Sequence, residues 1–143
     1  MTRVDFYVLP AGTPDPVLTA CKLCEKAVNQ GLRVYLHAAP DTVEALDGAL
    51  WSFRQGSFIA HETWRGQPMA EPLPPVLLGE LEPPSSHYAV LITLVDEIPA
   101  WFSRFERVLE IVCGDDDARR RSRARFKSYR DRGFPLQTHE LPA

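Results

Sequence analysis

The sequence has 143 residues, of which 45% are hydrophobic and 24% are charged, and its net charge at neutral pH is −3. These proportions are typical of a globular protein and exclude a disordered or fibrous chain, and the length predicts one domain over residues 1–143. No apolar run approaches the ~20 residues that a membrane-spanning helix needs, and the first residues lack the pattern of a signal peptide. We therefore expect a cytoplasmic protein without a membrane partner, and the three cysteines predict no disulfide framework.

The first half of the chain alternates between strand and helix patterns. Residues 4–9 (VDFYVL) are a short apolar run, which predicts a strand. Apolar residues recur at helical spacing over residues 16–30, and Gly31 is suited to end that helix. Residues 32–36 predict a second strand, and Asp41 is placed to cap a second helix that ends near residue 53.

The second half predicts shorter strands and one more helix. The strands are expected at residues 57–61, 76–78, 88–94 and 108–112, and a further edge strand at residues 134–141. Three aspartates at 115–117 are suited to the positive end of the last helix, which Gly133 would close. Alternating strands and helices predict an α/β fold with a mostly parallel sheet.

The turn after the first strand carries no nucleotide-binding motif. In nucleotide-binding α/β proteins this turn is rich in glycine, because backbone amides must approach the phosphates closely. Here it reads LPAGTPD, with one glycine and without the GxGxxG or GxxxxGK[ST] spacing. No nucleotide cofactor is therefore predicted.

Two cysteines form a CxxC motif, but their surroundings are not those of a redox or zinc site. Cys21 and Cys24 lie well inside the first predicted helix, away from the N-terminus, where the helix dipole would lower a thiol pKa. A zinc site would need two further ligands, and the sequence has no second CxxC and no paired histidines. We interpret Cys24 as buried and Cys21 as partly exposed, and expect no metal site.

A small enzyme remains an alternative. It would place a polar cluster at the carboxyl ends of the strands, near residues 11–13 and His37. No recognised catalytic motif supports it, so we expect a protein that is not an enzyme.

Aromatic residues gather between the second helix and the following strand. Trp51 and Phe53 are followed closely by Phe58, with Trp64 just beyond. Such rings either pack onto the sheet or form an apolar patch for a protein partner, in which Trp and Phe act as anchors.

Half of the positive charge lies in one segment near the C-terminus. Residues 119–132 hold eight of the sixteen Lys and Arg residues and one of the nineteen acidic residues, so this segment carries +7 and the rest of the chain about −10. At 100° per residue, four cations share one face of the predicted helix, beside an arc that must face the sheet. The cations are Arg119, Arg123, Lys127 and Arg130, and the arc is Ala118, Ser122, Phe126 and Tyr129.

This basic stripe has few acidic partners at i±4, so its like charges are expected to be largely uncompensated. A stripe of this kind beside aromatic rings suits an anionic ligand with an apolar tip, because guanidinium groups can hold a terminal carboxylate. A solvated basic face is the simpler interpretation. Direct binding of single-stranded nucleic acid is another, with Phe126 or Tyr129 stacking on bases. The acidic remainder of the chain argues against strong direct DNA binding.

Several segments together resemble the chi subunit of bacterial DNA polymerase III. They are VDFYVL, ALDGALWSF followed by SFIAH, then RFERVLEIV and RARFKSYRDRGF, in this order. The resemblance implies a Rossmann-like α/β/α fold of three layers without a nucleotide site, and a non-catalytic accessory role in the clamp-loader complex. It also implies two partners, the psi subunit and the acidic C-terminal tail of single-stranded DNA-binding protein, which ends in a Pro-Phe pair.

Residue by residue, the resemblance implies a tail-binding site on the last helix. Arg123 would be the principal anchor of the terminal carboxylate. The other implied site residues are the supporting cations Arg119 and Lys127 and the residues around the terminal ring, Val112, Phe126 and Tyr129. Phe126 stands where a tyrosine can occur in the family, which keeps the ring and removes a hydroxyl.

The resemblance implies a separate partner surface at Trp51 and Phe58. The psi subunit would bind there, and an XPD-like helicase would compete for the same surface in some bacteria. Ala60 stands where relatives carry proline, so the loop that presents Phe58 is expected to differ slightly.

Overall fold

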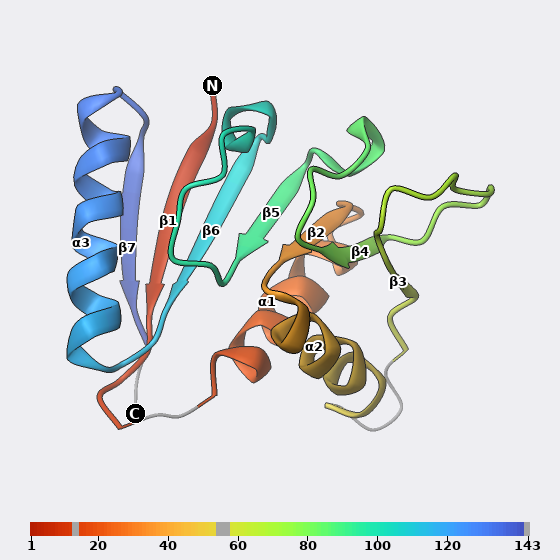
Figure 1. Ribbon diagram of the computed structural model, residues 1–143, viewed down its shortest axis with the longest axis horizontal. Helices are drawn as coiled ribbons and strands as arrows, with labels where there is room; N and C mark the ends of the chain where they lie inside the picture. The colour runs from red at the N-terminus through yellow and green to blue at the C-terminus, as the bar shows by residue number, and fades with distance from the viewer. Residues whose placement is uncertain (13–14, 54–57, 142–143) are drawn as a thin grey trace.

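The computed structural model describes residues 1–12, 15–53 and 58–141, and its strands form one seven-stranded sheet (Figure 1). The elements are β1 (Arg3–Val8), α1 (Pro16–Asn29), β2 (Val34–His37), α2 (Pro40–Ser52), β3 (His61–Thr63), β4 (Val76–Gly79), η1 (Ser85–His87), β5 (Val90–Thr93), η2 (Phe102–Arg104), β6 (Arg107–Val112), α3 (Asp116–Asp131) and β7 (Leu136–Glu140). The strand order is β3-β4-β2-β5-β6-β1-β7, and every pair is parallel. The predicted α/β fold with a mostly parallel sheet is confirmed.

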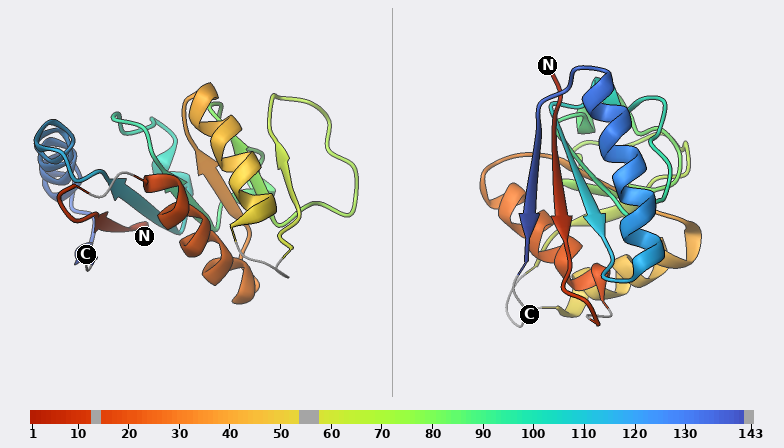
Figure 2. Two further views of the ribbon diagram at one scale, coloured as in Figure 1. Left: turned by 90° about the horizontal axis from the view of Figure 1, so that it is seen from below. Right: turned by 90° about the vertical axis from the view of Figure 1, so that its left-hand side faces the viewer.

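The sheet is the middle of three layers. Helices α1 and α2 pack on one face, and α3 packs on the other over the β6, β1 and β7 side (Figures 1 and 2). Alternation along each strand builds the two cores, since Leu36 faces α1 and α2 while Tyr35 faces the layer that holds Tyr129. In the described ranges no helix combines the length and apolar character that crossing a membrane requires.

Helix α2 begins two residues earlier than the sequence predicts, and Asp41 is not its cap. The N-cap is Ala39, which offers no side-chain hydrogen bond, and Pro40 is the first helical residue. Proline suits this position because its fixed φ is already helical and its missing N–H would have no helical partner there. Asp41 lies in the first turn, where its carboxylate accepts a hydrogen bond from the Thr42 amide at 2.9 Å.

The short strands are shifted from their predicted positions. The strand expected at 57–61 is β3 (His61–Thr63), since pairing with β4 begins at His61, and residue 57 lies outside the described residues. The strand expected at 32–36 begins at Val34, because its register is set by Val76 on β4 and Val90 on β5. The C-terminal edge strand is confirmed as β7, which lies beyond β1.

Candidate functional site

Helix α3 carries most of the basic segment. It starts where the Asp115 carboxylate accepts a hydrogen bond from the Ala118 amide at 2.7 Å, and Asp116 and Asp117 add negative charge to its first turn. It ends at Asp131, and Gly133 follows with a φ of 86°, a conformation that favours glycine. Both predicted boundaries of this helix are confirmed.

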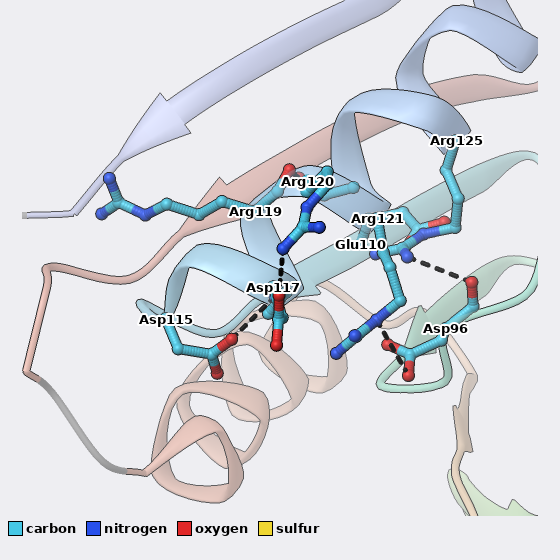
Figure 3. Close-up of polar contacts among 10 residues, drawn as sticks. Asp96, Glu110, Asp115, Asp117, Arg119, Arg120, Arg121 and Arg125 are labelled. Carbon is cyan, nitrogen blue, oxygen red and sulfur yellow. Dashed lines mark hydrogen bonds and ion pairs between the residues drawn. The ribbon is translucent and has the colours of Figure 1, made fainter.

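The flank of α3 that faces the loop between β5 and β6 is electrostatically compensated. Arg121 pairs with Asp96 at 3.3 Å, and Arg125 bonds both Glu110 and the Asp96 carbonyl at 3.1 Å (Figure 3). Arg132 lies over the Phe102 ring, 5.6 Å from its centroid. The partners come from other elements, which spacing along the helix does not reveal.

Two further cations of α3 pair within the helix. Arg120 pairs with Asp117, and Lys127 with Asp131 at 3.3 Å. Of the four cations predicted to form an uncompensated stripe, Lys127 is compensated, so the prediction is wrong for that residue, whereas Arg119 and Arg123 have no acidic partner among the described residues. The opposite flank, which lies toward β7, has fewer acidic partners among the described residues, and we call it the open flank: Arg119, Arg123, Phe126 and Arg130.

Arg123 has the fewest polar contacts of the cations on the open flank. It is exposed, and its side chain has no ion pair or hydrogen bond within residues 1–12, 15–53 and 58–141. Arg119 extends away from the ion pairs around Asp96 and donates to the Leu9 carbonyl at 3.1 Å, while its Nε is buried without a partner among the described residues (Figure 3). Arg130 is 3.7 Å from Asp131, a contact with little stabilising effect at an exposed position.

The aromatic residues lie under this flank at different depths. Phe126 is half-buried, with its ring centroid 5.4 Å from that of Phe6. Val112 and Tyr129 are buried, and the Tyr129 hydroxyl donates to Glu110 at 2.9 Å. Of the three ring-site residues that the resemblance implies, Phe126 is therefore the one at the surface, and the other two form the layer beneath it.

Sequence reasoning missed the buried group that holds α3 to the sheet. Glu110 is fully buried on β6, and Arg125 and Tyr129 donate to its two oxygens. Burial raises the pKa of Glu110 to about 7, although Arg125 and the Tyr129 hydroxyl favour its charged form. One signal was present: a glutamate in the apolar strand RVLEIV needs a buried cation or donor as its partner.

A second surface, on the opposite side of the sheet, carries exposed aromatic rings. Trp51 at the end of α2 is 59% exposed and Phe58 is 69% exposed, and their ring centroids are 5.4 Å apart. The His61 ring lies 4.9 Å from Trp51 and supports it from β3. The alternative that these rings pack onto the sheet is thus wrong for Trp51 and Phe58. It holds for Trp64, which is half-buried and donates its indole N–H to the Glu82 carbonyl at 2.8 Å.

At the carboxyl ends of β1 and β6, one of the places where a doubly wound fold can bind a nucleotide, backbone segments lie close together. Such sites lie where neighbouring strands send their chains to opposite faces, here at the carboxyl ends of β1 and β6. A Cβ on Gly114 would lie 2.3 Å from the Pro10 carbonyl oxygen and 3.1 Å from the Ala11 Cα. In the described part of these connections, the backbones at Pro10, Ala11 and Gly114 are therefore in direct contact.

The polar groups considered for an enzyme are not brought together. His37 ends β2, and two strands separate it from β1, which leads to residues 11 and 12; residue 13 lies outside the described residues. Cys21 and Cys24 are both fully buried, so the expectation of a partly exposed Cys21 is wrong. Burial raises the pKa of the Cys21 thiol to about 11, which keeps it protonated at neutral pH.

His37 gives a prediction about pH. Its ring is bonded to Thr93 and to the Glu80 carbonyl, and burial lowers its pKa to about 4. The unfolded chain binds this proton near pH 6.5, so stability present above that pH is lost as the pH falls toward 4. We expect His37 to account for a loss of about 2 kcal/mol between pH 7 and pH 5. Urea unfolding of wild type and His37→Gln at both pH values checks this, and equal losses in the two proteins would contradict it.

Comparison with known proteins agrees with this architecture. Residues 1–137 match the family described as DNA polymerase III chi subunit, HolC. DNA polymerase III subunit chi of Pseudomonas aeruginosa is 46% identical over 144 residues, which cover 99% of each chain. The protein of the same name from Escherichia coli (strain K12) is 29% identical over 96% of this chain and 97% of its own length. The chain therefore belongs to the DNA polymerase III chi subunit family.

Proposed function

We propose that this protein is a non-catalytic accessory subunit that links the clamp-loader complex to single-stranded DNA-binding protein. It would bind the acidic C-terminal tail of that protein on the open flank of α3 and bind a psi-type partner at Trp51 and Phe58. Family membership and the two separate surfaces support this function. The observation that carries it is Arg123, an exposed cation without an ion pair among the described residues, on the same flank as the half-buried Phe126 ring.

In the proposed complex, Arg123 holds the terminal carboxylate of the tail. Arg119 and Lys127 lie one helical turn away on either side and add positive charge. The terminal ring packs against Phe126, under which Val112 and Tyr129 keep the surface apolar and rigid. Binding is expected to weaken with salt, since exposed cations are screened over about 8–10 Å at moderate ionic strength.

The partner surface at Trp51 and Phe58 is the second half of the proposal. Two adjacent aromatic rings with most of their area exposed are a typical anchor for a protein partner. The psi subunit is the proposed occupant, and an XPD-like helicase is a competitor for the same rings. This surface and α3 lie on opposite faces of the sheet, so both partners can bind at once (Figures 1 and 2).

We expect a substitution in one surface to reduce binding of that surface's partner only. Arg123→Ala should lower the affinity for an acidic peptide ending in Pro-Phe by roughly 10- to 100-fold. This is the effect of losing a charge-assisted hydrogen bond, which contributes about 1.5–3 kcal/mol. Trp51→Ala should leave the affinity for that peptide unchanged and lower the affinity for the psi subunit by more than about 30-fold. Fluorescence anisotropy with labelled peptide and labelled psi measures both affinities.

Arg120→Ala is the matched control, because Arg120 is an exposed arginine of the same helix that already pairs with Asp117. It should change the peptide affinity less than twofold or so. An amidated peptide should bind wild type as weakly as the free-acid peptide binds Arg123→Ala. If a single-stranded oligonucleotide binds well and the peptide does not, direct nucleic-acid binding replaces the proposed tail site.

A further inference from the structure

A cavity of about 380 Å³ lies over β1 and β7, on the face of the sheet opposite α3. Its charged and aromatic lining comes from β1, β6, β7 and the end of α1: Arg3, Asp5, Tyr7, Lys26, Arg107 and His139. None of these residues belongs to the open flank or to the Trp51 surface. The volume is in the range of small-ligand sites, and the lining is polar.

The cavity carries excess positive charge in a protein whose remaining body is acidic. Asp5 is its acidic member, and the side chain of Asp5 is only 8% exposed. Its two oxygens are occupied by Arg107 at 3.2 Å and His139 at 3.1 Å. Arg3 and Lys26 are exposed, and neither side chain has a partner within the described ranges. The two free cations are therefore available to an anionic group.

The cavity borders an open edge of the sheet. β7 is the last strand in the order, and it pairs only with β1 among the described strands (Figure 2). Gln137 and His139 of this strand line the cavity. The Tyr7 and His139 rings stack, with their centroids 4.6 Å apart. The outward backbone groups of such a strand can pair with an added strand, whose alternate side chains then point to one face.

We propose that this edge and cavity bind an extended acidic segment of a partner protein. The segment pairs with the free edge of β7 and places an acidic side chain between Arg3 and Lys26. A peptide fits better than nucleic acid for two reasons. Strand pairing uses peptide backbone, and the cationic area is small and surrounded by an acidic body that repels a polyanion. Stacked Tyr7 and His139 supply an apolar wall for the stem of the acidic side chain.

Nuclear magnetic resonance titration of the full chain with a capped peptide tests this proposal. The probe is Ac-Thr-Glu-Val-Glu-Val-Glu-Thr-NH2, which has no terminal carboxylate and no phenylalanine and so cannot use the proposed α3 site. We expect amide shifts along β7 and a loss of affinity on the order of tenfold in the double variant Arg3→Glu, Lys26→Glu. Arg123→Ala should bind this peptide as wild type does, which separates the two proposals.

Lys22→Glu is the matched control, an exposed lysine of α1 outside the cavity. Unchanged affinity in this variant shows that the loss is local to the cavity. Three results would overturn the proposal: unshifted β7 amides, equal losses in Lys22→Glu and the double variant, or β7 shifts with a single-stranded oligonucleotide and none with the peptide.

Discussion

Replacing Arg125 by alanine is expected to lower the free energy of unfolding by about 3–5 kcal/mol. The change leaves the Glu110 carboxylate fully buried without its cation, and it also removes the bond from Arg125 to the Asp96 carbonyl. A buried charge that loses its partner is far more costly than a lost surface pair. Urea unfolding monitored by circular dichroism measures the difference.

The destabilisation caused by Arg125→Ala should increase with pH. Burial already raises the pKa of Glu110 above its value in the unfolded chain, and loss of Arg125 raises it further. The unfolded chain releases this proton at lower pH than the folded one. Stability is therefore lost as the pH rises from the pKa of Glu110 in the unfolded chain to its pKa in the folded variant. The variant is therefore expected to be less destabilised at pH 5 than at pH 8.

Two comparisons separate this effect from general damage to α3. Arg121→Ala removes a neighbouring arginine whose side chain is 49% exposed and pairs with Asp96, and it should cost less than about 1 kcal/mol. The double change Arg125→Met with Glu110→Leu removes both charges and should recover much of the stability. A cost for Arg125→Ala no larger than that for Arg121→Ala would contradict a buried ion pair.

Gly114→Ala is expected to lower the free energy of unfolding by about 3 kcal/mol, the upper end for overpacking. The new Cβ would lie 2.3 Å from the Pro10 carbonyl oxygen and 2.9 Å from its carbon. These are backbone atoms, which cannot move aside as the end of a side chain can. One of the two connections that meet at the carboxyl ends of β1 and β6 must shift.

The same change should weaken binding of the tail peptide. Arg119 bonds the Leu9 carbonyl next to Pro10, so displacement of this backbone moves a cation of the open flank. Gly48→Ala is the control, because Gly48 lies exposed in α2 with nothing within 4 Å of its added Cβ. It should raise stability by up to about 1 kcal/mol, as alanine favours helix. Wild-type stability and affinity in Gly114→Ala would contradict this account.

The order of helices and strands and the two ends of α3 could be predicted from the sequence. These features depend on short-range interactions: apolar runs, the acidic first turn at Asp115 and the glycine at 133 act within a few residues. The family was also visible, since several short segments occur in the expected order. A predicted helix cap at Asp41 was wrong because Pro40 can begin a helix without a capping side chain.

Which cations of α3 lack an acidic partner, within the part of the chain that the structure describes, depends on the tertiary fold. Spacing along the helix predicts that Arg119, Arg123, Lys127 and Arg130 share a face, but it does not reveal that Arg121 and Arg125, outside that face, meet Asp96 and Glu110. These two partners lie 15 to 29 positions earlier in the sequence. Partners at that distance are set by strand order, which no local pattern encodes. The same holds for the cavity at Arg3 and Lys26, which exists because β7 lies beyond β1 at the edge of the sheet. Ion pairing and exposure are properties of the packed chain, and helical periodicity predicts only which residues share a face.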